Sequence, residues 1–282
     1  MNYRHVYHAG NFADVVKHVC LVALLRGLSR KDSPWLYLDT HAGAGRYDLR
    51  SPPAQKTGEY RTGIELLKKA TGSLPPALSD YLDVLRALTD TAQPPHDHYY
   101  PGSPLLAAAL ARPQDRLVTC ELNPLEHAAL DECLRGQRRC TVALQDGYQA
   151  LAAYLPPRER RGLVLIDPPY EDPREFTRLA KALIDAHRRF ATGCYALWYP
   201  LKDEGPLAGL KRQLKTSGLR RLLTIELRLT PLPQGGMLHG CGVLVMNPPW
   251  GFAEQMRLTL PVLAQILAPA SGTAAVDWLV PE

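Results

Sequence analysis

The sequence predicts an α/β fold, in which helices cover both faces of a mostly parallel β-sheet. Short apolar runs of strand length alternate with longer segments that suit helices. One early run leads directly into a glycine-rich turn, and the last two runs lie too close together for a helical crossover. With 282 residues, of which 46% are apolar, the chain has enough material for one large domain or two modest ones.

Composition and charge exclude several classes of protein. The 21 glycines and 25 prolines follow no repeat, so the chain is neither collagen-like nor disordered. No apolar run reaches the roughly 18 residues of a membrane span, and no secretory signal is recognisable, so we expect a cytoplasmic protein without membrane contact. The six cysteines form no C-x-x-C pair, and we expect them to be reduced, with no metal site. The net charge of +5 mildly favours a polyanionic partner.

The first element is a helix over residues 12–29. Its apolar side chains recur at spacings of three and four between Val15 and Leu25, which predicts an amphipathic helix. Asn11 is the expected N-cap. The apolar run 35–40 then predicts the first strand of the sheet.

Residues 46–98 interrupt the alternation of strands and helices. Helix-like pieces at 58–70 and 78–89 are separated by turns that contain proline, and we interpret the stretch as an inserted helical subdomain. The chain is thereby divided into residues 1–45, which hold an N-terminal tail, a helix, the first strand and its glycine loop, the insertion 46–98, and the remainder of the same domain, 99–282.

The rest of the sheet follows the insertion. Further strands are expected at 116–122, 140–144, 161–170, 194–200, 222–229 and 240–250. Helices are expected over 103–112, 124–135, 146–154, 173–190 and 203–217. Only about ten residues join the last two strands, so this pair should be an antiparallel hairpin. A mostly parallel sheet that ends in this way is the Rossmann-like arrangement of class I methyltransferases.

A glycine loop follows the first strand, with the pattern Asp39-x-x-x-Gly43-x-Gly45. Glycines at such a place let main-chain N–H groups approach a nucleotide cofactor closely. The third glycine of the dinucleotide fingerprint is missing, because Asp48 stands there. An ordinary tight turn is therefore the alternative interpretation.

Two acidic residues extend the case for a nucleotide cofactor. Glu121 closes the strand after the insertion, where such folds place the acceptor for ribose hydroxyls, and the insertion accounts for its distance from the loop. Asp146, followed by Gly147, could accept the amino group of a bound adenine. The alternatives are a solvated strand end for Glu121 and an ordinary Asp-Gly turn for Asp146.

The most specific motif is Asp167-Pro168-Pro169-Tyr170, directly after a predicted strand. An exocyclic amino group on a base is a poor nucleophile, because its lone pair is delocalised into the ring. A carboxylate and a rigidly aimed main-chain carbonyl can hold both N–H bonds and help to localise that lone pair. Consecutive prolines stiffen the backbone, and the aromatic ring can stack on a base taken out of its helix.

A second motif, Asn247-Pro248-Pro249-Trp250, competes for the same role. It follows the terminal antiparallel hairpin, whereas substrates of such folds bind at the carboxyl ends of the parallel strands. We therefore predict a structural turn at Asn247. Clusters of basic residues, Arg138 and Arg139 among them, are either phosphate contacts or ordinary solvated surfaces.

Several segments together resemble the RlmJ family of ribosomal large-subunit RNA methyltransferases, over essentially the whole chain. These segments are Tyr3-Arg4-His5, His8-Ala9-Gly10-Asn11, Asp14-Val15, Lys17-His18, residues 37–47, Thr57-Gly58-Glu59-Tyr60, residues 99–104, residues 166–170, residues 195–200 and residues 278–282. Methyltransferases in general share Gly-x-Gly and Asp-Pro-Pro-Tyr, but not the early histidine block or the segments at 57–60 and 99–104.

The resemblance implies a monomeric enzyme that transfers a methyl group from S-adenosylmethionine to N6 of adenine 2030 in 23S rRNA, leaving S-adenosylhomocysteine. It implies catalytic roles for Asp167, Pro168 and Tyr170, and RNA contacts for Tyr3 and Lys17. With the glycine loop, the cofactor contacts fall on His18, His41, Gly43, Ser103, Glu121, Asp146, Gly147 and Asp167. The alternatives are a DNA adenine methyltransferase, a nucleotide-dependent dehydrogenase, and a non-catalytic RNA-binding or ribosome assembly factor.

Overall fold

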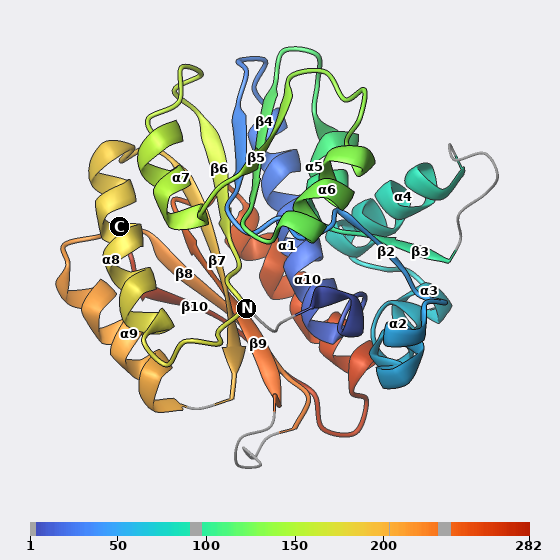
Figure 1. Ribbon diagram of the computed structural model, residues 1–282. Helices are drawn as coiled ribbons and strands as arrows, with labels where there is room; N and C mark the ends of the chain where they lie inside the picture. Colours follow the sequence, from blue (N-terminus) through green and yellow to red (C-terminus); the bar gives the residue numbers. More distant parts are fainter. Residues whose placement is uncertain (1–3, 91–97, 203, 231–237) are drawn as a thin grey trace.

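A mixed β-sheet of eight strands runs through the molecule in the order β10-β8-β9-β7-β6-β1-β4-β5 (Figure 1). The computed structural model describes residues 4–90, 98–202, 204–230 and 238–282. The strands are β1 (Leu36–Asp39), β4 (Arg116–Glu121), β5 (Cys140–Leu144), β6 (Gly162–Ile166), β7 (Cys194–Leu201), β8 (Leu222–Arg228), β9 (Gly240–Met246) and β10 (Thr273–Val280). The first five of these are parallel, and β9 runs antiparallel to both β7 and β8.

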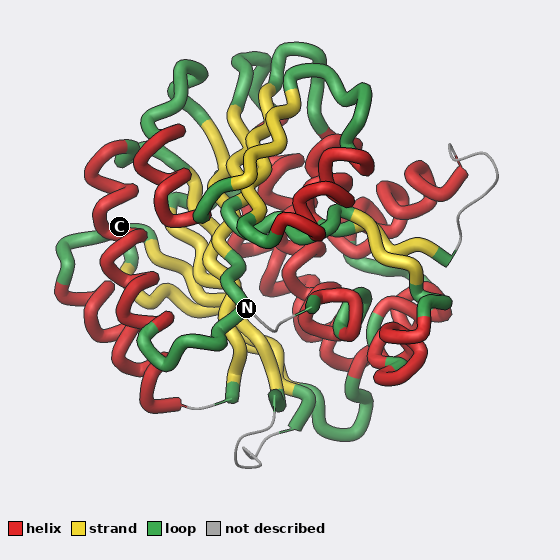
Figure 2. Tube along the Cα trace, in the orientation of Figure 1, coloured by secondary structure: helices red, strands yellow, loops and turns green. Residues whose placement is uncertain are grey.

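Helices cover both faces of the sheet, as Figure 2 shows. They are α1 (Phe12–Ser29), α5 (Ser103–Leu110), α6 (Pro124–Cys133), α7 (Gly147–Tyr154), α8 (Glu175–Arg189), α9 (Glu204–Thr216) and α10 (Phe252–Leu267). One core cluster joins the sheet to α1, α5 and α10, and a second joins its other face to α7, α8 and α9. Successive side chains of a strand point to opposite faces of the sheet and so belong to different clusters. Tyr37 belongs to the first cluster, and Leu36 and Leu38 belong to the second.

The α/β prediction is confirmed, including the antiparallel pairing of β8 with β9. In that pair Leu222 lies opposite Met246. Helix α10 and strand β10, which follow β9, were not predicted. Helix α10 packs on β8 and β10, and β10 adds an antiparallel edge strand to β8. Strand β9 lies between β7 and β8, and β10 lies outside β8. The β8–β9 hairpin is therefore not the edge of the sheet, because β10 is the edge strand on that side.

Helix α1 is buried on more sides than the amphipathic helix that the spacing predicted. Its N-cap is Asn11, as expected, and the side chain accepts from the Asp14 N–H. However, every residue from Phe12 to Leu25 is buried, because α1 contacts β6 and β9 as well as α4, α5 and α10. Polar groups on its early turns are therefore enclosed by protein.

The stretch 46–98 is mostly helical and is bounded by a small two-stranded sheet. Its elements are β2 (Arg46–Asp48), α2 (Pro52–Thr57), a 3-10 helix (Glu59–Thr62), α3 (Ile64–Lys69) and α4 (Pro76–Asp90), with β3 (Tyr99–Pro101) pairing with β2. The helix expected over 58–70 is broken at Gly63. The backbones approach closely there, since a Cβ on Gly63 would lie 2.2 Å from the Gly10 carbonyl oxygen. The division into 1–45, 46–98 and 99–282 stays a prediction.

Candidate active site

A cavity of about 410 Å³ lies at the carboxyl ends of the parallel strands, facing the first turns of α1. This volume is in the range of small-molecule sites, roughly 300–1,000 Å³. All the predicted site residues that the structure describes line it: Lys17, His18, His41, Gly43, Ser103, Glu121, Asp146, Gly147, Asp167, Pro168 and Tyr170. Tyr3 lies outside the described residues.

The glycine loop is tied to the next strand through Glu121. The Gly43 N–H donates to Glu121 Oε2 at 2.9 Å, and the Asn123 N–H donates to Oε1 at 2.7 Å. Glu121 is 5% exposed, so it is not a solvated strand end. A carboxylate has about four acceptor positions, and those that remain can take ribose hydroxyls. Gly43 has φ of +61°, a backbone conformation that favours glycine.

Asp39 is a buried carboxylate that was not among the predicted site residues. It accepts from the Tyr37 hydroxyl at 2.7 Å and from the Ser103 hydroxyl at 2.6 Å. Burial raises the pKa of Asp39 to about 6. Because the Ser103 hydroxyl donates its hydrogen bond to Asp39, the lone pairs of the Ser103 oxygen can accept a hydrogen bond from a ligand.

His18 lies on α1 and is neutral at ordinary pH, since burial lowers its pKa to about 3. Its Nδ1 is hydrogen-bonded to the Tyr100 hydroxyl at 2.8 Å, and the Tyr100 hydroxyl also bonds that of Tyr81 at 2.9 Å. The other ring nitrogen, Nε2, is buried and has no partner within the described part of the chain. A buried polar atom without a partner is costly, so a ligand in the cavity is the expected partner.

Asp146 has two structural roles besides lining the cavity. Its Oδ1 caps α7 by accepting from the Tyr148 and Gln149 N–H groups at 2.8 and 3.1 Å. Its Oδ2 pairs with Arg178 at 3.0 Å. The Asp-Gly turn and the cavity position are thus compatible, and an adenine amino group would share Oδ2 with Arg178. Gly147 allows close packing, since a Cβ there would lie 2.1 Å from the Thr40 carbonyl oxygen.

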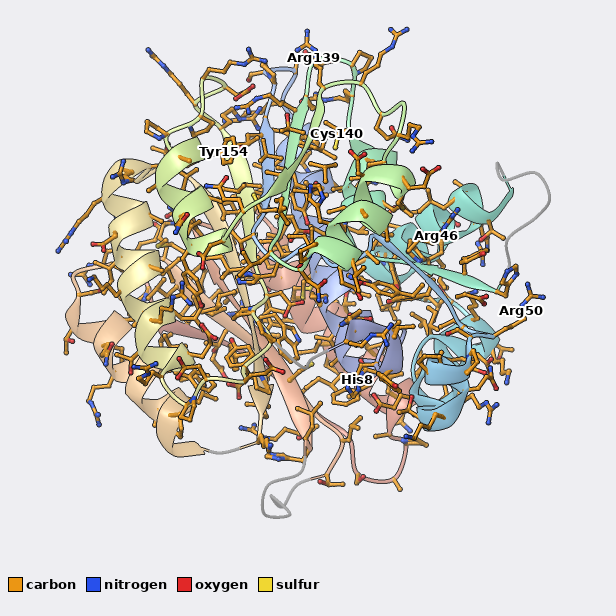
Figure 3. All side chains as sticks on the ribbon, in the orientation of Figure 1. His8, Arg46, Arg50, Arg139, Cys140 and Tyr154 are labelled. Atoms are coloured by element: carbon orange, nitrogen blue, oxygen red, sulfur yellow. The ribbon has the colours of Figure 1, made fainter. Side chains whose placement is uncertain are left out.

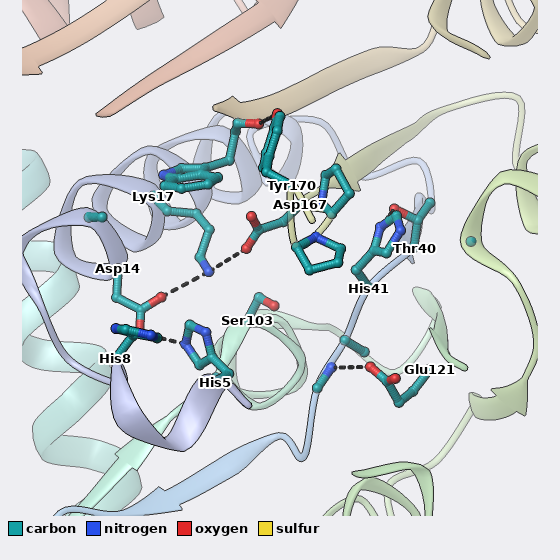
Figure 4. Close-up of a pocket in the computed structure, with 18 of the residues that line it drawn as sticks. His5, His8, Asp14, Lys17, Thr40, His41, Ser103, Glu121, Asp167 and Tyr170 are labelled. Atoms are coloured by element: carbon teal, nitrogen blue, oxygen red, sulfur yellow. Dashed lines mark hydrogen bonds and ion pairs between the residues drawn. The ribbon is translucent and has the colours of Figure 1, made fainter. Parts of the chain in front are cut away.

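Asp167 follows β6 and forms an ion pair with Lys17 across the cavity (Figure 4). The Lys17 Nζ lies 2.6 Å from Asp167 Oδ2. Pro168 is buried, which fixes the start of the turn. Tyr170 has φ of 54° and donates its hydroxyl to the Trp198 carbonyl oxygen at 2.5 Å. The turn is therefore held at both ends.

Asp14, which pairs with Lys17, was quoted in the family motifs but given no role. Asp14, one turn earlier on α1, lies 2.9 Å from Lys17 Nζ and also pairs with His5 Nε2 at 2.8 Å. Burial alone lowers the pKa of Lys17, but Asp14 and Asp167 outweigh it and hold that pKa well above its ordinary value. The i, i+3 spacing of Asp14 and Lys17 was the signal in the sequence.

The motif at Asn247 is a structural turn, as predicted, and it lies at the end of the sheet away from the cavity, where the parallel strands begin. Met246, the last residue of β9, pairs with Tyr195 near the start of β7. The Asn247 side chain donates to the carbonyl oxygens of Ala191 and Gly193 at 2.8 and 2.9 Å. Trp250 is 89% exposed.

The remaining expectations concern metals, membranes and basic surfaces. Within the described ranges no three His, Cys, Asp or Glu side chains are grouped so that they could hold a metal ion. None of the helices described has both the length and the apolar character of a membrane span. The six cysteines all lie in described segments and are free. Arg139 lies just before β5, at the top of Figure 3, far from His8 of the cavity.

Comparison with known proteins identifies the family of this chain. Residues 32–280 match the family model described as "Ribosomal RNA large subunit methyltransferase D, RlmJ". The chain is 43% identical to a protein of Escherichia coli K12, and 41% identical to one of Haemophilus influenzae Rd, over the full length of each; both are named "Ribosomal RNA large subunit methyltransferase J". A crystal structure of a Legionella pneumophila protein is 37% identical, with a TM-score of 0.88 over 96% of this chain and 98% of that one.

These matches extend over the strands that surround the cavity and over the turn that carries Asp167. By sequence over its whole length, and by the matched family model, the chain belongs to the RlmJ family of ribosomal RNA large subunit methyltransferases.

Proposed function

We propose that this protein methylates N6 of an adenine in 23S rRNA, adenine 2030, with S-adenosylmethionine as the methyl donor. One observation carries the proposal: the Asp167-Pro168-Pro169-Tyr170 turn borders the same cavity as the residues predicted to bind a nucleoside cofactor. Family membership supports a ribosomal RNA as substrate. We also propose that the protein acts as a monomer in the cytoplasm and that the stretch 46–98 is a subdomain.

The cavity suits the donor in size and in polar groups. Glu121 would accept the ribose hydroxyls, Asp146 the adenine amino group, and Ser103 and the unpartnered His18 Nε2 would meet further polar atoms. When bound, S-adenosylmethionine supplies a methyl group on a positively charged sulfur. The buried carboxylate of Asp39 fixes Ser103 from behind, so this side of the cavity is organised before a ligand binds.

Asp167 and the Pro168 carbonyl would hold the two N–H bonds of the target amino group and orient its lone pair toward the methyl carbon. Only one carboxylate oxygen, Oδ2, is paired with Lys17, so Oδ1 remains to accept from the amine. The Tyr170 ring borders the same cavity and is braced edge-on by Trp198, with 5.7 Å between ring centroids. Such a fixed aromatic face suits a base that has been flipped out of its helix. Tyr3 and Lys17 would contact the RNA.

The test measures transfer of labelled methyl groups from S-adenosylmethionine to deproteinised 23S rRNA and, separately, to duplex DNA. We expect label in the RNA only, recovered as N6-methyladenine. In cells without the gene, the methyl group at adenine 2030 of 23S rRNA should be missing. Asp167→Ala should abolish transfer while binding of S-adenosylhomocysteine persists. Asn247→Ala, at the other Pro-Pro-aromatic turn, is the matched control and should transfer normally. Wild-type turnover by Asp167→Ala would refute the proposal, and RNA affinity without any transfer would favour an assembly factor.

A further inference from the structure

The cavity contains a buried ammonium that is shared between two carboxylates. Lys17 Nζ lies 2.6 Å from Asp167 Oδ2 and 2.9 Å from Asp14 Oδ1, and the Lys17 and Asp14 side chains are 7% and 2% exposed. Asp167 is therefore not the only partner of Lys17. Charged groups this deeply buried are stable only when paired and hydrogen-bonded, so the placement of each depends on the other two.

Asp14 is the most constrained member of this group. Its Oδ2 accepts from His5 Nε2 at 2.8 Å and from the Gly10 N–H at 2.9 Å, while Oδ1 takes Lys17. Its own N–H is capped by Asn11. Asp14 thus joins the chain before α1 to the helix itself and, through Lys17, to the turn after β6, 150 residues along the chain.

The balance of charge gives this sharing a consequence. Lys17 divides its positive charge between Asp14 and Asp167, beside the place where the target amine gains positive character during attack. Without the charge of Asp14, Lys17 and Asp167 would form a neutral pair. Asp167 would then be held more closely by Lys17, in competition with the incoming amino group.

We propose that Asp14 is a positioning residue for methyl transfer: by sharing Lys17, it keeps the Asp167 carboxylate oriented and free enough to accept the target amino group. The inference rests on the proposed function. Asp14 itself need touch neither RNA nor cofactor. Its effect should therefore appear in the rate of transfer and not in the affinity for the cofactor.

The test compares Asp14→Asn, which removes the charge at nearly constant shape, with Asp14→Glu, which keeps the charge. We expect the single-turnover rate of Asp14→Asn, at saturating RNA and S-adenosylmethionine, to fall on the order of 100-fold, the effect of a reacting group displaced by about 1 Å. Affinity for S-adenosylhomocysteine should stay within about threefold of wild type. Asp14→Glu should recover part of the rate, to within roughly tenfold of wild type.

Asp115→Asn is the matched control, because Asp115 is also a buried aspartate paired with an arginine, Arg112, at 2.8 Å, but does not line the cavity. It should lose stability and keep its single-turnover rate. A wild-type rate for Asp14→Asn, or an equal rate for Asp14→Asn and Asp14→Glu, would overturn the inference. If Asp14→Asn does not fold, Asp14→Ser, which also removes the charge, takes its place: a rate below that of Asp14→Glu at unchanged cofactor affinity supports the inference, and an equal rate overturns it. Absence of transfer by the wild-type protein would instead refute the proposed function.

Discussion

Replacing Tyr100 by phenylalanine should damage both stability and cofactor binding, although Tyr100 does not line the cavity. Its hydroxyl is the bridge between His18 Nδ1, at 2.8 Å, and the Tyr81 hydroxyl, at 2.9 Å, and all three side chains are buried. Phenylalanine keeps the ring that stacks on His18, with 5.5 Å between centroids, and removes only the bridging oxygen. The change therefore isolates the polar network from the packing.

The magnitude follows from the groups left unpaired. His18 Nδ1 and the Tyr81 hydroxyl would each lose a buried partner, at about 1–3 kcal/mol apiece. The free energy of unfolding should therefore fall by at least about 2 kcal/mol, or roughly 4–8 °C in Tm for a domain of this size. With neither ring nitrogen held, His18 would no longer be fixed at the cavity, and we expect about tenfold weaker binding of S-adenosylhomocysteine, equivalent to about 1.4 kcal/mol.

Urea unfolding and titration calorimetry measure the two effects. Tyr195→Phe is the matched control, because the Tyr195 hydroxyl is also buried and donates to two carbonyl oxygens, of Ala186 and Phe190, both at 2.9 Å. Tyr195 belongs to the core on the other face of the sheet, so its loss should lower stability and leave cofactor affinity unchanged. Tyr100→Phe with unchanged cofactor affinity would refute the role of His18, and unchanged stability would refute the network.

Three further predictions use the same cavity. In urea titrations, His18 should contribute a fall of about 2 kcal/mol in the free energy of unfolding between pH 7.5 and 5, because unfolded His18 binds a proton near its ordinary pKa of 6.5, whereas in the folded protein its pKa is about 3. His18→Asn should remove that contribution, and an unaltered pH dependence would contradict the assignment. Gly147→Ala should weaken S-adenosylhomocysteine binding at least about tenfold in calorimetry, because the new Cβ would lie 2.1 Å from the Thr40 carbonyl oxygen; wild-type affinity would show that the turn can yield. S-Adenosylhomocysteine at 100 times its Kd should raise the free energy of unfolding by about 2.7 kcal/mol; a thermal scan without a shift would exclude binding at that concentration.

The strands could be predicted because burial on both faces of a parallel sheet demands continuous apolar runs. The direction of each strand could then be derived from the length of its connection. That reasoning predicted a catalytic turn at Asp167 and a structural turn at Asn247, although both are followed by Pro-Pro and an aromatic residue. The pairing of Met246 with Tyr195 places Asn247 at the end of the sheet away from the cavity. Helix α10 and strand β10 were not predicted, because their positions depend on contacts with β8, which lies far away in the sequence.

The contacts within the cavity could not be predicted in the same way. Lys17 and Asp167 are separated by 150 residues, and Ser103 and Asp39 by 64. Neither pair has a local signature, because each depends on how the insertion and the crossovers fold back. Asp39 was predicted only as the end of a strand and the start of the glycine-loop pattern, although its burial and its hydrogen bond to Ser103 let it support the site.

Helix α1 carries a signal that its apolar spacing concealed. A helix with apolar residues on every side is expected in a core, where charged residues are costly unless they are paired. Asp14, Lys17 and His18 nevertheless occupy its early turns, and each of the three is buried. A core helix that keeps such residues needs charged or polar partners from other parts of the chain, and Asp167 and Tyr100 supply them. Buried charge in an otherwise apolar helix is thus a sequence feature that indicates the site independently of the glycine loop and the Asp-Pro-Pro-Tyr turn.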